Sequence, residues 1–356
     1  MREVLMEGQP EIVPVLDAHR IDEKRLADYL QQRDLLDGPL TVRQFQGGQS
    51  NPTYLLESGA RRYVLRKKPP GKVLPSAHQV DREYRVMKAL GEHSQVPVPT
   101  MHVLCEDDEV IGTSFYVMDF VPGRVYSHPQ LESLDKNDRT RLYQDKIDTL
   151  ARLHRVDYQA AGLGDFGRPQ GYVTRQVKRW SAQYEASKTD ELPAMDNLMA
   201  WLADNIPDDD SAAIAHGDFR LGNLLVDNRE ARVVAVLDWE LATIGHPLAD
   251  LAYCCLPYHM PHGVNGVRGL DGLDLSARGI PDERTLLERY CEGAGRDGIN
   301  DWPVFLAFAL FRSAAILQGV YARALQGNAS NRDALEVGKR AGLMAERGWQ
   351  IARAHK

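Results

Sequence analysis

The sequence predicts an α+β protein of two lobes, a small antiparallel sheet with one inserted helix and then a larger, mostly helical lobe. Its 356 residues suffice for two domains or one large bilobal unit. From about Thr41 to Val121, runs of β-branched and aromatic residues alternate with glycine and polar turns, which is typical of strands. After Pro122-Gly123 the apolar residues recur at helical spacing. We therefore expect an N-terminal lobe of residues 1–121 and a C-terminal lobe of residues 122–356.

The first lobe should contain five strands and one helix. The expected strands are Thr41–Phe45, Thr53–Glu57, Arg62–Arg66, Met101–Cys105 and Ser114–Phe120. The turn Ser58-Gly59-Ala60 joins the second strand to the third, so these two predict a hairpin. The segment Asp81–Leu90 places Tyr84 and Met87 on one face of a helix.

The second lobe should contain six helices, interrupted once by two short strands. The expected helices are Asn137–Val156, Arg175–Ser187, Met195–Asn205, Arg284–Cys291, Trp302–Arg323 and Arg332–Ala354, and the strands are Leu224–Val226 and Val233–Leu237. Gly263, Gly266, Gly269 and Gly272 recur every third residue. Collagen would need a far longer repeat, which leaves a flexible surface loop or a lid over a substrate as interpretations.

Charge and composition narrow the function classes. The formal net charge of −7 provides no general field for nucleic acid or anionic lipid. The most apolar run, Trp302–Phe311, ends at Arg312, short of the ~20 apolar residues that a membrane span needs. The N-terminus shows no signal-peptide pattern, and four cysteines do not make a disulfide framework. We expect a cytoplasmic protein that binds neither nucleic acid nor membrane, of undetermined oligomeric state.

The densest group of chemically capable residues is His216–Asn223, followed by Val236–Glu240. Asn223 opens one expected strand and Asp238 ends the next, so a hairpin would place the two side by side. Amide and carboxylate oxygens suit Mg²⁺. Asp218 lies five residues before Asn223 and can accept a proton from an alcohol that attacks a phosphate. Phosphoryl transfer needs such a metal site, such a base and a cradle for the nucleotide.

This spacing resembles the kinase catalytic loop, in which a base Asp precedes a metal-binding Asn by five residues. The opening HGD, together with LDWE, resembles the aminoglycoside phosphotransferase and choline-kinase branch of the bilobal protein-kinase-like fold. The segments GGQSNPTYLL, YVLRKKPPG, REYRVM, LHRVD, HGDFRLGNLL and VLDWELATIGHPLADLAY together resemble a narrower subgroup. That subgroup consists of bacterial phosphotransferase-like proteins similar to the kinase domain of eukaryotic acyl-CoA dehydrogenase fusion proteins. The resemblance runs from about Gln46 to Tyr253.

The resemblance implies a role for several residues of the catalytic centre. Asp218 would be the catalytic base, and Asn223 and Asp238 the Mg²⁺ ligands. Glu83 would pair with the phosphate-binding cation, which is Arg66 here although kinases carry Lys at that place. A guanidinium can hold a phosphate and pair with Glu83 at once. Lys67 is the alternative cation, but strand alternation would point it away from the cleft if Arg66 points inward.

The resemblance also implies a nucleotide site and the cofactors ATP and Mg²⁺. Gly47, Gly48 and Ser50 fall where kinases lay a glycine-rich turn over the phosphates, although the same loop alone would be read as a hairpin turn. The backbone of Asp119 and Val121, at the expected hinge between lobes, would meet the adenine edge. The sequence does not distinguish ATP from GTP.

These residues predict ATP- and Mg²⁺-dependent phosphorylation of a hydroxyl group on a small molecule. The acceptor stays open between an aminoglycoside-like polycation and a hydroxylated acyl thioester or acid, with contacts expected from about Tyr258 to Asn300. A non-catalytic pseudokinase is the alternative, and the intact Asp218, Asn223 and Asp238 argue against it. A protein kinase is disfavoured because no A-P-E motif follows Asp238.

Three further polar residues have structural interpretations. His216 is expected to brace the backbone of the catalytic loop, and Asp250 to brace the same loop or cap a helix. His154 lies on an apolar helix face and should be a satisfied core residue. Glu240 is either a second metal-binding carboxylate or a structural one.

Overall fold

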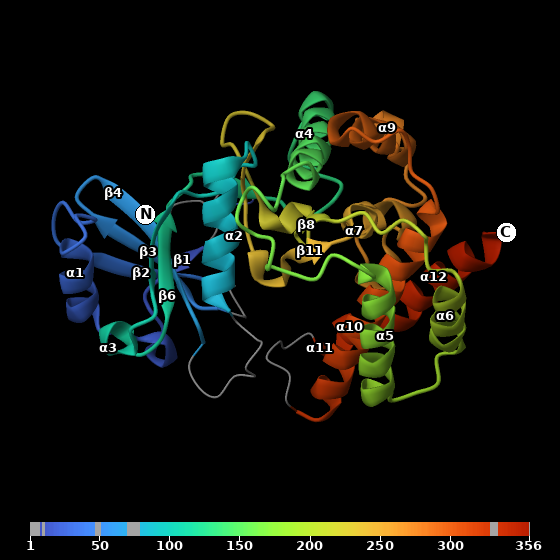
Figure 1. The fold of residues 1–356 in the computed structure, drawn as a ribbon, viewed down its shortest axis with the longest axis horizontal. Coiled ribbons are helices and arrows are strands. Elements are labelled where there is room, and N and C mark those ends of the chain that lie inside the picture. The colour runs from blue at the N-terminus through green and yellow to red at the C-terminus, as the bar shows by residue number, and fades with distance from the viewer. Residues whose placement is uncertain (1–7, 9–10, 47–50, 70–78, 328–333, 356) are drawn as a thin grey trace. The chain divides into compact units, whose positions relative to one another are not determined.

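The computed structural model describes residues 8, 11–46, 51–69, 79–327 and 334–355, which form two compact units (Figure 1). The first unit comprises Met1–Ser127 and Gly222–Ala242, and the second comprises His128–Leu221 and Thr243–Lys356. The sequence predicts a boundary after Val121, with all later residues in the second lobe. In the structure residues 222–242 pack with the first unit, because their two strands pair with a strand at residues 124–125.

An antiparallel sheet of six strands, in the order β1-β2-β3-β4-β6-β5, forms the body of the first unit. The strands are β1 (Ile12–Val13), β2 (Thr41–Phe45), β3 (Thr53–Ser58), β4 (Arg61–Lys67), β5 (Met101–Cys105) and β6 (Phe115–Asp119). The five predicted strands are confirmed, and β3 and β4 form the predicted hairpin, with Thr53 opposite Arg66. Sequence patterning missed β1, which is too short to show alternation.

Helices cover both faces of this sheet. α1 (Glu23–Gln31) and α3 (Asp108–Ile111) share an apolar core with one face, and that core includes Leu65 of β4. α2 (Val80–His93) packs against β5 and β6 (Figure 1). Because neighbouring residues of a strand face opposite sides, Leu65 lies on the α1 face while Arg66 points to α2.

The remainder of the first unit is a small sheet in the order β10-β9-β7. Its strands are β7 (Arg124–Val125), β9 (Leu224–Val226) and β10 (Val233–Val236). Leu224 lies opposite Val236 in the β9–β10 hairpin, so the residue before β9 lies close to the residues that follow β10. The next residues form a 3-10 turn, η3 (Trp239–Leu241), where buried Trp239 donates from Nε1 to Val236 O at 2.9 Å. This packing fixes the backbone on both sides of Asp238.

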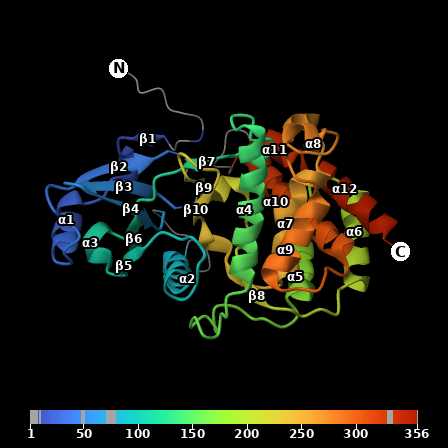
Figure 2. The same cartoon turned by 90° about the horizontal axis from the view of Figure 1, so that it is seen from above.

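The second unit is helical apart from one strand pair, β8 (Ala213–Ala215) with β11 (Thr243–Gly245). Its helices are α4 (Lys136–His154), α5 (Tyr172–Ser187), α6 (Pro193–Asp204), α7 (Pro247–His259), α8 (Leu275–Arg278), α9 (Glu283–Ala294), α10 (Trp302–Leu325), α11 (Ala334–Gly338) and α12 (Ala341–Ala354). α4 packs against α9, and α10 lies among α5, α7 and α12 (Figure 2).

α10 is the central helix of the second unit. By length and composition it could cross a membrane, yet 78% of its most apolar window is buried inside the protein, as expected for a core helix. Arg312, which ends the apolar run in the sequence, is itself buried and donates from Nη2 to Gly217 O at 2.8 Å. The core helix therefore holds the backbone of the segment before Asp218.

The predicted single helix Arg332–Ala354 is wrong in one respect, because the structure has two helices there, α11 and α12. α11 ends at Gly338, where an added Cβ would lie 2.5 Å from Cβ of Tyr321 on α10. A glycine at this close contact lets α11 end against α10, and the chain turns at residues 339–340 before α12 begins.

Candidate active site

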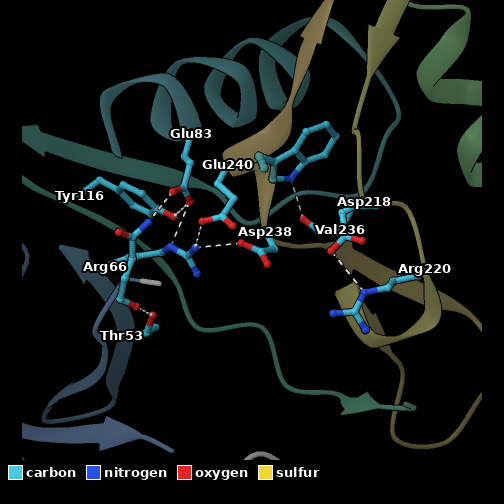
Figure 3. Close-up of polar contacts among 11 residues, drawn as sticks. Thr53, Arg66, Glu83, Tyr116, Asp218, Arg220, Val236, Asp238 and Glu240 are labelled. Atoms are coloured by element: carbon cyan, nitrogen blue, oxygen red, sulfur yellow. Dashed lines mark hydrogen bonds and ion pairs between the residues drawn. The ribbon is translucent and has the colours of Figure 1, made fainter. Parts of the chain in front are cut away.

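An ion-pair cluster around Arg66 lies at the end of β4 in the first unit (Figure 3). Arg66 Nε lies 3.0 Å from Glu83 Oε2 on α2, and Nη2 lies 2.8 Å from Asp238 Oδ1 and 3.9 Å from Glu240 Oε2. The predicted pairing of Arg66 with Glu83 is therefore present. Arg66 thus lies against three carboxylates, those of Glu83, Asp238 and Glu240.

Glu83 is the most enclosed member of this cluster. Its side chain is 1% exposed, and it accepts hydrogen bonds from Asn51 Nδ2 at 2.9 Å and from Tyr116 Oη at 3.0 Å. Burial raises the pKa of Glu83 to about 7, although the positive charge of Arg66 acts in the opposite direction. Asn51 and Tyr116 were not predicted. Asn51 directly follows Gly47–Ser50 in the sequence, and this position next to an expected phosphate-binding turn could have identified it.

Asp238 and Asn223 lie at neighbouring points of the β9–β10 hairpin, as the sequence predicts. Leu237 N, one residue before Asp238, donates to Asn223 O at 2.8 Å. Asp238 has a left-handed backbone conformation with φ of 66°, which is uncommon for a residue other than glycine. Its carboxylate is 34% exposed and so remains accessible, whereas Asn223 is buried. The first unit thus offers a carboxylate and an amide from one hairpin.

Asp218 belongs to the second unit and lies in the turn after β8. Its Oδ1 accepts a hydrogen bond from Tyr253 Oη on α7 at 2.5 Å. Its Oδ2 accepts one from Arg220 Nε at 3.2 Å (Figure 3). Tyr253 is buried, and burial raises the pKa of its hydroxyl above the usual range, with the charge of Asp218 adding to the shift. Sequence reasoning missed Tyr253 and Arg220. Tyr253 lies one helical turn after Asp250, a spacing that indicates a shared helix face.

Asp250 of α7 holds the backbone that precedes Asp218. Its carboxylate accepts hydrogen bonds from His216 N at 2.7 Å and Gly217 N at 2.9 Å, and Oδ2 lies 3.4 Å from His154 Nε2. Burial alone would raise the pKa of Asp250, but His154 and these donors outweigh it and hold the pKa below its usual value. The interpretations of Asp250, His216 and His154 as structural residues are confirmed.

The sequence predicts nucleotide contacts from the glycine-rich turn and from the hinge. Gly47, Gly48 and Ser50 lie outside the described residues. Asp119 ends β6, where its N–H donates to Thr100 O at 2.9 Å. Val121 follows outside any helix or strand.

Lys67, the alternative phosphate-binding cation, is buried on the strand face opposite Arg66. Burial lowers the pKa of its ammonium group. Arg66 rather than Lys67 reaches Glu83, which is what strand alternation predicts when Arg66 points inward.

Comparison with known proteins gives a consistent assignment. The model of the phosphotransferase enzyme family matches residues 41–304. Mouse acyl-CoA dehydrogenase family member 10 is 44% identical over 349 residues, which cover 97% of this chain and 32% of that protein. The chain spans less than half the length of the curated relatives of this kind that it matches.

Solved structures agree with this assignment. A crystal structure of a candidate aminoglycoside phosphotransferase from Ralstonia eutropha is 46% identical, has a TM-score of 0.87, and covers 95% of this chain and 100% of its own. A spectinomycin phosphotransferase in complex with ADP and spectinomycin is 14% identical, with a TM-score of 0.60 and coverage of 94% and 98%, and shows the fold alone. The bilobal kinase-like fold and the resemblance found in the sequence are confirmed, and the chain belongs to the phosphotransferase enzyme family.

Proposed function

We propose that the protein transfers the γ-phosphoryl group of ATP to a hydroxyl group of a small molecule, with Mg²⁺ as cofactor. The observation that carries this proposal is Arg66, held by Glu83 at the end of β4 and in contact with Asp238. A guanidinium fixed by a buried carboxylate is a ready phosphate ligand, and the adjacent carboxylate suits a hard cation.

The residues present fit Mg²⁺ rather than a metal that needs a complete protein cage. Mg²⁺ is commonly held through one or two carboxylates together with substrate phosphates and waters. Among the described residues no group of three His, Cys, Asp or Glu side chains forms a metal site. Asp238 and Asn223 would hold the ion, and Arg66 would turn to the phosphates. The metal supplies neutralisation of charge on the transferred phosphoryl group.

Asp218 is proposed as the catalytic base. Its carboxylate accepts a hydrogen bond from Tyr253 Oη and is 21% exposed, so it can accept a second hydrogen bond from the hydroxyl group of an acceptor. In the reaction the acceptor oxygen forms a bond to the γ-phosphorus, the bond to the β-phosphate oxygen breaks, and ADP leaves. The proton of the acceptor hydroxyl passes to Asp218.

Two classes of acceptor are proposed. An aminoglycoside-like alcohol corresponds to the name of the Ralstonia relative, and a hydroxyacyl compound corresponds to relatives named as acyl-CoA dehydrogenases. We also propose residues 1–121 as the nucleotide-binding lobe and residues 122–356 as the catalytic and acceptor-binding lobe, of which residues 222–242 pack with the first unit. We further propose a cytoplasmic protein that acts on neither nucleic acid nor membrane. Spectinomycin phosphotransferase binds ADP on the same fold, which supports a nucleotide cofactor.

Measurement of ATP consumption across aminoglycosides, choline-like alcohols and hydroxyacyl thioesters tests this function. The wild-type chain should consume ATP with at least one of these acceptors, and Asp238→Ala should not. Asp204→Asn, on the exposed end of α6, is the control variant. Binding of ATP by the wild-type chain without turnover on any acceptor would favour the pseudokinase instead.

A further inference from the structure

A cavity of about 490 Å³ lies in the second unit, beside the loop of residues 260–272 that carries the repeated glycines. Its lining includes His128, Gln130, Glu132, His262, Arg268 and Arg340. None of these residues belongs to the cluster around Arg66 or contacts Asp218 in the interactions described above. The part of the lining from His262 to Arg268 falls within the segment, about Tyr258 to Asn300, that the sequence predicts to contact the acceptor.

The glycine-containing loop that forms one wall is folded on itself. His262 N donates to Asp271 O at 3.2 Å, and Gly263 N donates to Val267 O at 3.1 Å. A Cβ at position 269 would lie 1.7 Å from Met260 O, so this close approach of two backbone segments requires glycine. The backbone contacts of this loop therefore give the wall of the cavity a defined shape.

A chain of hydrogen bonds fixes the imidazole of His262. Arg278 Nη1 donates to Gln130 Oε1 at 3.2 Å, which orients the buried amide of Gln130 so that its Nε2 donates to His262 Nδ1 at 2.8 Å. An imidazole that accepts at Nδ1 carries its proton at Nε2. His262, which is exposed, thus presents an N–H donor.

Two guanidinium groups add positive charge to the same cavity. Arg268 donates to His128 Nε2 from the loop. Gly266, with φ of +67°, lies against Arg340, because a Cβ there would be 3.0 Å from Arg340 Nη2. Glu132 is the acidic residue of the lining. In a chain of net charge −7, this gathering of N–H donors is the arrangement that phosphate and carboxylate groups bind.

We propose that this cavity is an anion-binding subsite, which takes a phosphate or carboxylate group carried by the acceptor. Its role as an acceptor anchor rests on the proposed function. α7 connects the two places, since Tyr253 contacts Asp218 and the helix ends at His259, about 9 Å further along its axis. An acceptor with its anion in the cavity and its hydroxyl at Asp218 would be an elongated, negatively charged alcohol, and a polycationic acceptor would be disfavoured.

Calorimetric titration of the full chain with inorganic pyrophosphate and with citrate, without nucleotide or metal, tests the subsite. Arg268→Gln and Arg340→Gln should each weaken binding of the preferred anion by about tenfold, since each removes a charge-assisted contact. Glu132→Gln should tighten binding. The matched control is Arg353→Gln, an exposed arginine about 20 Å along α12 from Arg340, which should bind as the wild type does.

The two anions distinguish whether the group that the cavity binds is a phosphate or a carboxylate. Tighter binding of pyrophosphate identifies a phosphate-bearing ligand, and tighter binding of citrate identifies a carboxylate-bearing one. Because pyrophosphate can also enter a nucleotide site, only a loss specific to the cavity variants supports the proposal. Equal binding by the wild type, Arg268→Gln and Arg340→Gln, or no binding of either anion at millimolar concentration, overturns it.

A kinetic measurement then tests the role as an anchor. In the cavity variants the KM for an anionic alcohol acceptor should rise about tenfold, while the KM for ATP and the kcat stay near the wild-type values. An unchanged acceptor KM overturns the anchor. The titration needs no turnover, so a failure of the proposed kinase activity would leave the anion-binding result intact and distinguishable.

Discussion

The brace formed by Asp250 predicts a large loss of stability in the variant Asp250→Asn. In the wild type the two carboxylate oxygens accept separate backbone N–H groups, from His216 and Gly217, inside the protein. An asparagine side chain of the same shape has one acceptor oxygen. Its NH₂ group must therefore face one of these two backbone donors, and that donor stays unsatisfied.

The expected loss in the free energy of unfolding follows from these two hydrogen bonds. An unsatisfied buried donor costs about 1–3 kcal/mol, and loss of the negative charge weakens the remaining bond by about 1 kcal/mol. The expected decrease in the free energy of unfolding is therefore about 2–4 kcal/mol. Urea unfolding followed by both tryptophan fluorescence and circular dichroism measures it, because two probes reveal whether the two units unfold separately.

Asp204→Asn is the matched control for this measurement. Asp204 is the exposed last residue of α6, so the same chemical change there should alter the free energy of unfolding by less than about 0.5 kcal/mol. If Asp250→Asn is as stable as this control, the carboxylate does not hold the loop and the reasoning is refuted.

Three further outcomes are expected. Burial raises the pKa of Glu83 in the folded state to about 7, so the native state binds an extra proton between about pH 4.5 and 7, and stability should fall as the pH rises through that window. Glu83→Gln should lose this part of the pH dependence in thermal unfolding, and an unchanged profile would refute the assignment. Tyr253→Phe removes the hydroxyl that orients Asp218; kcat should fall about tenfold with an unchanged KM for ATP, whereas a change confined to the KM for ATP would contradict a positioning role. Arg66→Met should weaken ATP binding by about tenfold or more, while Lys67→Met, on the opposite strand face, should not; the reverse result would identify Lys67 as the phosphate-binding cation.

Residue patterning predicted five of the six strands of the main sheet because runs of β-branched and aromatic residues are bounded there by glycine and polar turns. The strands it missed, β1, β7, β8 and β11, have two or three residues each and show no period. The helices α1, α3, α7 and α8 were also missed, so the prediction of one helix in the first lobe is wrong. α3 and α8 have four residues each, and α7 has no amphipathic stripe because most of its residues are buried. Short strands and central helices are recognised through their tertiary contacts, which a single sequence does not display.

The sequence predicts those parts of the candidate site whose residues are brought together by a hairpin or by the alternation of a strand. Asn223 and Asp238 are neighbours because a short hairpin joins them, and Arg66 meets Glu83 because the strand alternates. Tyr253 reaches Asp218 from 35 residues away, through the packing of α7 beside β8. No local pattern encodes such a contact, so only the folded chain reveals it.

The most direct test of the central claim compares the wild type with Asp218→Asn in ADP formation with a productive acceptor, together with ATP affinity by calorimetry. Removal of a catalytic base should lower turnover by ~10²–10⁴-fold, and ATP affinity should remain within about twofold of the wild type, because Arg66 and Asp238 are untouched. Turnover that survives the substitution, or ATP affinity that is lost together with it, would contradict the proposed role of Asp218.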